Sequence, residues 1–483
     1  MRELLSDLMD AAARRADYAD ARFVATRSQR IATRNGELDQ LDSSEQAGIG
    51  VRVRLDGSWG FAATRETTRA AAESALERAL AIARAAAAGG GGGGGVAPLT
   101  EEPRATGYHE TPFRTDPFTV STADKLAVLA AADAELRRDA AVTLASAHFA
   151  AYAEDKLFAS TEGALCEQRT IECGGGLSAT VATDEETQVR SYPGSHEGGV
   201  SQAGYEHFEA LDLPRHAARV AAEAGELARA PACPAGATTL ILAGEQLALQ
   251  VHESVGHAVE LDRVLGREAS YAGTSFVAAE DAGSLAYGSQ LMNVTADATS
   301  PGGLGTIAWD DEGVTGRAEP IVRDGVLRGF LSSRETASEI GRERSAGCMR
   351  AEGFARQPLV RMTNVNLEPG EAGSLEDLIA ATERGILMDT NRSWSIDSQR
   401  LQFQFAAEAA WEIEDGERGR LLRNPSYAGI TPEFWGRLDA VCSTPEWRLW
   451  SVLNCGKGEP GQAMHVSHGV APARFRDVDV GVA

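Results

Sequence analysis

Cysteine is scarce in this chain, and acidic residues outnumber basic ones. The six cysteines among 483 residues include no C-x-x-C pair and are too few for a disulfide framework, which favours a reducing, cytoplasmic environment. The chain has 46 lysines and arginines and 70 acidic residues, which gives a net charge of −24. No basic cluster stands out. This charge balance argues against nucleic acids and anionic membranes as partners.

An apolar run long enough to cross a membrane is also missing. The first residues, 1–7, are too charged to begin the apolar core of a secretory signal. The long alanine-rich stretch 69–88 is interrupted by charged residues, so it predicts a soluble helix and not a span. We therefore expect no membrane partner.

The run H-E-S-V-G-H at residues 252–257 carries the clearest chemical signal. Imidazole is the commonest metal ligand, and a glutamate beside the first histidine matches the metallopeptidase motif H-E-x-x-H. Here His257 comes one residue later, and in a regular helix it would point about 140° away from His252. A π-bulge brings i and i+5 into near-alignment, and Gly256 would ease that distortion. The run therefore predicts either a metal site on a distorted helix or no metal site.

A catalytic zinc takes three protein ligands and leaves one position open. Five downstream residues are candidates for the third: Glu260, Asp262, His465, His468 and Cys455. Glycines around Cys455 predict a tight, exposed backbone, and Lys457 would favour the metal-binding thiolate. Glu260 and Asp262 are also candidates for orienting a ligand histidine, although solvated helix charges are the simpler interpretation. We rank His465 and His468 below Cys455, because they can equally line a pocket or the surface.

These motifs together resemble the TldD/PmbA family, on the TldD side. The resemblance joins the 252–257 run to a late loop, Asn454-Cys455-Gly456-Lys457-Gly458, and covers essentially the whole chain. Further matching stretches are 48–53, 59–61, 310–313, 324–330 and 358–364. The metal motif is the most specific part, because the PmbA/TldE branch typically lacks it. The segment 399–405 departs from the best-known members, which bears on substrate preference and not on the metal site.

The resemblance implies a zinc metallopeptidase. It assigns His252, His257 and Cys455 as ligands of Zn²⁺ and Glu253 as the general base. It also implies an unfolded peptide as substrate, and either a homodimer or a heterodimer with a metal-free TldE/PmbA-like sister chain. Two other interpretations stay open: a zinc amide hydrolase acting on a modified peptide or small-molecule conjugate in a biosynthetic pathway, and a non-catalytic partner subunit. The intact ligand set argues against the last of these.

Length predicts two or more domains. We expect an α+β fold, with an N-terminal α/β domain (1–235) whose helices pack on a mixed sheet. A β-rich antiparallel catalytic domain (236–483) follows and carries the metal-binding helix at 243–265. Prolines 231 and 234 mark the boundary between the two. The glycine run 89–95 predicts a flexible insertion and no catalytic loop.

Local signals place several further features. The pairs Asn35-Gly36 and Asp56-Gly57 predict hairpin turns, and Ser121 predicts a helix cap. Helices are expected at 2–16, 65–88, 121–138 and 213–230, and strands at 20–34, 46–62, 141–190 and 238–242. Two further groups of residues each have two possible roles. Trp309, Asp310 and Asp311 form either an edge of the active site or a plain turn. Tyr427 and Trp435 form either a peptide-binding surface or a buried aromatic cluster.

Overall fold

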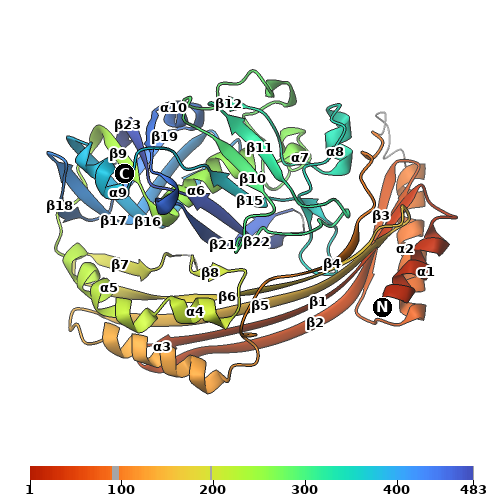
Figure 1. Ribbon diagram of the computed structural model, residues 1–483, viewed down its shortest axis with the longest axis horizontal. Helices are drawn as coiled ribbons and strands as arrows, with labels where there is room; N and C mark the ends of the chain where they lie inside the picture. The colour runs from red at the N-terminus through yellow and green to blue at the C-terminus, as the bar shows by residue number, and fades with distance from the viewer. Residues whose placement is uncertain (90–96, 196–197, 459, 482–483) are drawn as a thin grey trace.

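The computed structural model describes residues 1–89, 97–195, 198–458 and 460–481 (Figure 1). It is an α+β protein. A long curved sheet from the N-terminal half bends around one side of the C-terminal half, which contains two further large sheets. Of the glycine run 89–95, predicted as a flexible insertion, only Gly89 is described, as the C-cap of α2, and the rest lies outside the described residues. Among the described helices, none combines the length and apolarity needed to cross a membrane.

The N-terminal sheet runs in the order β3-β2-β1-β5-β6-β4, with β7 and β8 also paired to β6. Its strands are β1 (Tyr18–Arg34), β2 (Glu37–Leu55), β3 (Ser58–Thr64), β4 (Thr106–Glu110), β5 (Leu144–Ser160), β6 (Leu165–Ala182), β7 (Thr187–Tyr192) and β8 (Val200–Ser201). Both predicted hairpins are confirmed, with φ of 50° and 87° at Asn35 and Gly36 and of 45° and 75° at Asp56 and Gly57.

Helices cover only one face of this sheet. They are α1 (Arg2–Ala12), α2 (Arg69–Ala88), α3 (Thr122–Leu136), α4 (Tyr205–Ala210) and α5 (Leu213–Leu227), all on its outer side (Figure 1). The predicted Ser121 cap of α3 is confirmed, since its side chain accepts from the Asp124 N–H. Side chains alternate along a strand, so Ala147 and Phe149 of β5 pack toward α3 and α5, while Tyr152 and Glu154 point to the inner face.

The C-terminal half contains an inner sheet, which faces the N-terminal sheet, and an outer sheet. The inner sheet runs β12-β11-β10-β15-β22-β21, and the outer sheet β16-β9-β23-β19-β17-β18 with β20 beside β23. Inner-sheet strands are β10 (Val294–Asp297), β11 (Ala318–Arg323), β12 (Val326–Leu327), β15 (Asn364–Leu367), β21 (Arg448–Lys457) and β22 (Gln462–Val470). Outer-sheet strands are β9 (Gly236–Leu242), β16 (Arg384–Ile396), β17 (Gln402–Glu414), β18 (Glu417–Leu422), β19 (Ser426–Ile430), β20 (Leu438–Val441) and β23 (Ala473–Val480).

One helix lies between these two sheets. Helix α6 (Gly244–Val251) contacts β16 of the outer sheet and β15, β21 and β22 of the inner sheet, inside one apolar core. The expected antiparallel pairing is only partly right, because β15 pairs with β22 and β9 with β16 in parallel. Short elements complete this half: α7 (Leu261–Val264), α8 (Arg334–Glu339), α9 (Leu375–Ala380), α10 (Thr431–Gly436), and the paired β13 (Met349–Arg350) and β14 (Leu359–Val360).

Buried ion pairs join the two halves. Asp311 lies fully buried, with its carboxylate oxygens 3.2 Å from Arg22 Nη1 and 2.9 Å from Lys156 Nζ. Arg52 similarly joins Asp20, at 2.6 Å, to Glu312, at 3.3 Å. The segment around Asp311 therefore binds the N-terminal sheet, which gives it a structural role at the contact between the two halves.

Candidate metal centre

The chain after α6 changes helical type where the sequence predicts it. Residues His252–Gly256 form a π-helical turn, and the N–H of His257 donates to the carbonyl oxygen of His252, five residues back. A 3₁₀ turn, His257–Val259, follows. The expected continuous helix 243–265 is thus broken, and the predicted π-bulge is confirmed. Gly256 has a helical φ of −52°, and a Cβ there would collide with Met362 Sδ, so close packing explains this glycine better than conformational freedom.

The distorted turn brings the expected ligands together. In the described part of the chain, one group of three side chains is able to hold a metal: His252, His257 and Cys455, with ligand atoms within 4.8 Å of one another. His257 Nε2 lies 3.5 Å from Cys455 Sγ. A tetrahedral zinc, with Zn–N of about 2.0 Å and Zn–S of about 2.3 Å, would separate such atoms by about 3.5 Å. Two imidazoles and a thiolate therefore fit zinc in chemistry, and the His257–Cys455 pair also has the spacing of a zinc site.

Hydrogen bonds to both histidines leave the same ring nitrogen facing the site. His468 Nδ1 lies 2.8 Å from the carbonyl oxygen of Val365 and donates to it, so His468 Nε2 accepts from His252 Nδ1 at 2.7 Å. His257 Nδ1 donates to Glu260 Oε2 at 2.9 Å. Each ligand histidine therefore presents Nε2 with a free lone pair, held by a partner beyond the ligand shell.

The acidic residues after His257 form a buried charge cluster. Glu260 Oε2 lies 3.4 Å from Lys457 Nζ and 3.7 Å from Arg263 Nε. Lys457 Nζ also donates to Asp262 Oδ1 at 2.7 Å. Glu260 thus orients a ligand histidine, while Lys457 neutralises carboxylates. The solvated-charge interpretation of Glu260 and Asp262 is wrong, because both side chains are buried.

Cys455 lies in strand β21 and not in an exposed loop. Its side chain is 3% exposed and its strand partner is Met464, although the register slips between Val452 and Cys455. Burial by itself raises the pKa of the Cys455 thiol, but Arg361 and His257 together bring that pKa below its ordinary value. Arg361 also donates to the Cys455 carbonyl oxygen. The site therefore favours the thiolate, the form that binds metal.

Glu253 is positioned by an arginine from another segment. Its Oε2 forms an ion pair with Arg400 Nη1. Arg400 has a φ of 64° in a tight turn closed by its N–H to Asp397, and its carbonyl oxygen accepts from Thr431 Oγ1 at 2.8 Å. A residue held so closely fixes the direction of the Glu253 carboxylate.

Buried aromatic residues hold the same helix from the outer-sheet side. Tyr427 and Trp435 are fully buried. The Tyr427 hydroxyl donates to Gln250 Oε1 at 2.8 Å, and Trp435 Nε1 donates to Ser254 Oγ at 2.9 Å. The buried-cluster interpretation is confirmed, and these residues support the metal-binding turn.

His465 and His468 have different surroundings. Both lie on strand β22, where residues three apart point to opposite faces. His468 bonds His252, while His465 Nδ1 lies 2.5 Å from Glu172 Oε2 of the N-terminal sheet. Neither belongs to the group able to hold a metal, so both are wrong as candidate ligands.

Comparison with known proteins identifies the relatives of this chain. Models of the PmbA/TldA metallopeptidase match three consecutive parts: domain 1 at 19–83, the central domain at 115–230, and the C-terminal domain at 235–482. The chain belongs to the PmbA/TldD family. A metalloprotease of Methanocaldococcus jannaschii is 28% identical over 459 residues, or 94% of either chain. A zinc metalloprotease TldD homolog of Saccharolobus solfataricus is 26% identical over 51% of this chain and 52% of its own length.

A solved structure shares the whole fold. TldE from Thermococcus kodakarensis superposes with a TM-score of 0.75 at 16% identity, over 99% of this chain and 100% of its own. At this identity the likeness concerns the fold alone.

Proposed function

We propose that this member of the family is a zinc-dependent peptidase of the TldD type. The observation that carries the proposal is the π turn that places His252, His257 and Cys455 around one point with Glu253 in the same turn. The name of the Saccharolobus relative supports zinc as the metal. The intact ligand set argues against a purely non-catalytic subunit.

The residues around the site suit hydrolysis of an amide bond. Zinc bound there would supply Lewis acidity and a water whose pKa is lowered toward about 7. Glu253 would take the water proton and pass it to the leaving amine. Arg400 bonds Glu253 at Oε2, so Oε1 would take the proton. His468 and Glu260 would keep the two ligand rings in place during this transfer.

Burial of the centre favours a flexible substrate. His252, Glu253, His257 and Cys455 are only 2–6% exposed, so a folded protein surface does not reach them. An extended, unfolded peptide is the natural polymer substrate for such a site. A small amide conjugate remains the second candidate, because the same residues would hydrolyse it.

Assembly and location form part of the same proposal. We place the domains at 1–235 and 236–483 and the protein in the cytoplasm, and we propose a dimer. The metal-free partner would be a TldE/PmbA-like chain, and the fold shared with TldE supports two similar subunits. A homodimer is the alternative, and co-purification with a sister chain distinguishes the two.

Elemental analysis and peptide cleavage test the proposal together. The wild type should carry about one zinc per chain, as one site of three ligands predicts, and Cys455→Ser should lose it. Glu253→Gln should keep its zinc but lose cleavage of an unfolded protein such as reduced, alkylated casein. Zinc retained in Cys455→Ser would contradict the ligand set, and full cleavage by Glu253→Gln would contradict the general base.

A further inference from the structure

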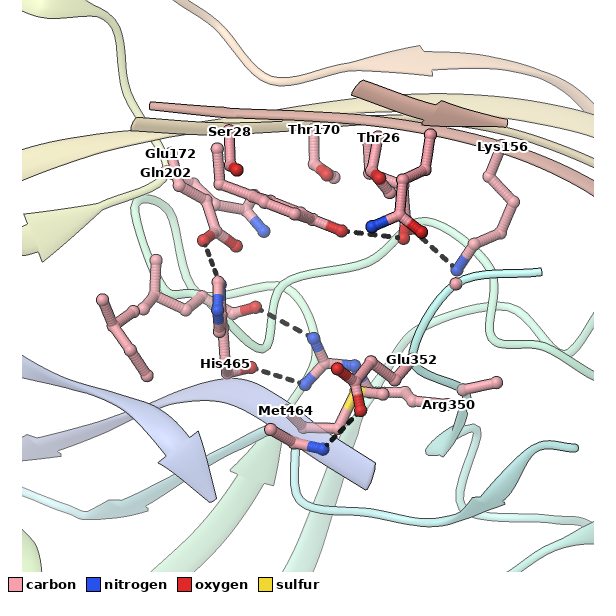
Figure 2. Close-up of a pocket in the computed structure, with 18 of the residues that line it drawn as sticks. Thr26, Ser28, Lys156, Thr170, Glu172, Gln202, Arg350, Glu352, Met464 and His465 are labelled. Carbon is pink, nitrogen blue, oxygen red and sulfur yellow. Dashed lines mark hydrogen bonds and ion pairs between the residues drawn. The ribbon is translucent and has the colours of Figure 1, made fainter. Parts of the chain in front are cut away.

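A second cavity lies on the opposite side of strand β22 from the metal centre. It has a volume of about 520 Å³ and lies between the inner face of the N-terminal sheet and the inner sheet (Figure 2). This volume is typical of small-molecule sites. Its described lining residues include His465 but not His252, Glu253, His257 or Cys455. The cavity and the metal centre are therefore separate sites.

The floor of the cavity is a polar grid on the N-terminal sheet. Strand register aligns two neighbouring rows across β2, β1, β5 and β6: Gln46, Thr26, Glu154 and Thr170 in one, and Ser44, Ser28, Tyr152 and Glu172 in the next. All of them line the cavity, and several point into it in Figure 2. A covered sheet face is usually apolar, so a largely polar one under a cavity suits a polar ligand.

The opposite wall carries a fixed positive charge. Arg350 Nη1 donates to the carbonyl oxygens of His465, at 2.8 Å, and Met362, at 3.2 Å, and Nη2 donates to that of Leu304 at 3.3 Å. In the described part of the chain, no carboxylate forms an ion pair with Arg350. Its guanidinium stays charged in proteins, so carbonyl dipoles hold a cation whose counter-charges, Glu172 and Glu154, lie across the cavity and not in direct contact with it.

Carboxylates gather on the floor facing that arginine. Glu172, 4% exposed, pairs with His465, and Glu154 lies 3.0 Å from Lys156 Nζ. Burial raises the pKa of Tyr152, and Glu154 and Glu172 raise it further, as expected beside negative charge. The floor therefore carries two glutamates beside Arg30 and Lys156, and the facing wall carries Arg350 beside Glu352.

We propose that this cavity binds a zwitterion, either a free amino acid or a short peptide. The ligand's carboxylate lies at Arg350, and its ammonium group lies at Glu154 and Glu172. Guanidinium and carboxylate form strong, charge-assisted hydrogen bonds, and the floor offers acceptors for an ammonium group. The proposal is independent of the metal centre.

Calorimetry on the full-length Glu253→Gln protein tests this, because bound peptide is then not cleaved. The probes are alanine, alanyl-alanine, alanyl-alanine amide and N-acetyl-alanyl-alanine. We expect alanyl-alanine to bind at least about 10-fold more tightly than either capped form, since each cap removes one charge-assisted pair. The ratio of alanine to alanyl-alanine affinity distinguishes an amino-acid site from a peptide site. Equal binding of the capped and uncapped dipeptides would overturn the proposal.

Single substitutions at the two ends of the cavity test where the dipeptide binds. Arg350→Gln should weaken alanyl-alanine at least about 10-fold and leave its amide unchanged. The exposed Arg420→Gln is the matched control for loss of one arginine charge. If Arg350→Gln fails to fold, Glu172→Gln tests the other end, because it should weaken alanyl-alanine but not the N-acetyl form. Binding that disappears in the zinc-site variant Cys455→Ser, yet survives Arg350→Gln, would place the peptide at the metal centre and refute the proposal.

Discussion

Replacing His468 with leucine tests how the metal centre is built. His468 is fully buried and its Nε2 accepts from His252 Nδ1 at 2.7 Å. Without it, a buried N–H loses its acceptor, which costs about 1–3 kcal/mol. The ring of His252 also loses its orientation, and partners of this kind are worth about 10- to 100-fold in metal affinity. We expect zinc to bind His468→Leu about 10- to 100-fold more weakly than wild type.

Competition with a chromogenic chelator measures that affinity. His465→Leu is the matched control, since the same substitution on the same strand points to the other face and should leave zinc affinity unchanged. His468→Gln should retain part of the affinity, because its amide oxygen offers an acceptor. Wild-type affinity in His468→Leu, or an equal loss in His465→Leu, would refute the role of His468.

Three further changes probe the proposed base, the buried histidines and the contact between the halves. Arg400→Gln should lower peptide turnover about 10- to 100-fold without loss of zinc, because Glu253 is then misdirected; unchanged kcat would contradict this. Burial lowers the pKa of His252 to about 4 and that of His257 well below its ordinary value. Below about pH 6.5 the unfolded chain therefore binds more protons at these two positions, and each histidine should lower the stability of the metal-free protein by about 1.4 kcal/mol per pH unit as the pH falls toward 4. Urea unfolding of the wild type and of His257→Gln isolates one such contribution, because buried carboxylates with raised pKa values, such as Glu245 at about 8, act in the opposite direction in both proteins. The same pH dependence in the two proteins would contradict it. Asp311→Asn leaves the buried Arg22 without its carboxylate partner and Lys156 with Glu154 alone, and should cost about 3–5 kcal/mol by the same assay; a loss below about 1 kcal/mol, as for an exposed pair, would count against that contact.

Local rules were enough for part of the fold. Both hairpins follow from Asn-Gly and Asp-Gly pairs, and the start of α3 follows from its serine cap, because these signals act within a few residues. The spacing of His252 and His257 was enough to predict a π turn. Cys455 was assigned by family resemblance, since no local rule joins residues nearly 200 positions apart.

Contacts between residues far apart in the chain could not be predicted from the sequence. Arg400 reaches Glu253, and Arg361 reaches Cys455, only through the folding of distant loops and strands. The glycines near Cys455 predicted a loop, yet pairing with β22 makes the segment a strand. This error also concealed the opposite orientations of His465 and His468, because residues three apart share a helix face but not a strand face.

The number of residues between successive side chains of the metal centre equals the hydrogen-bond spacing of the helical turn that joins them. His252 and His257 are five residues apart, and the turn between them is a π turn with an i to i+5 hydrogen bond. His257 and Glu260 are three residues apart, and a 3₁₀ turn joins them. The wide turn aligns two imidazoles that an α-helix would separate, and the tight turn then returns a carboxylate to the second imidazole. The extra residue relative to H-E-x-x-H is therefore part of the architecture that orients His257.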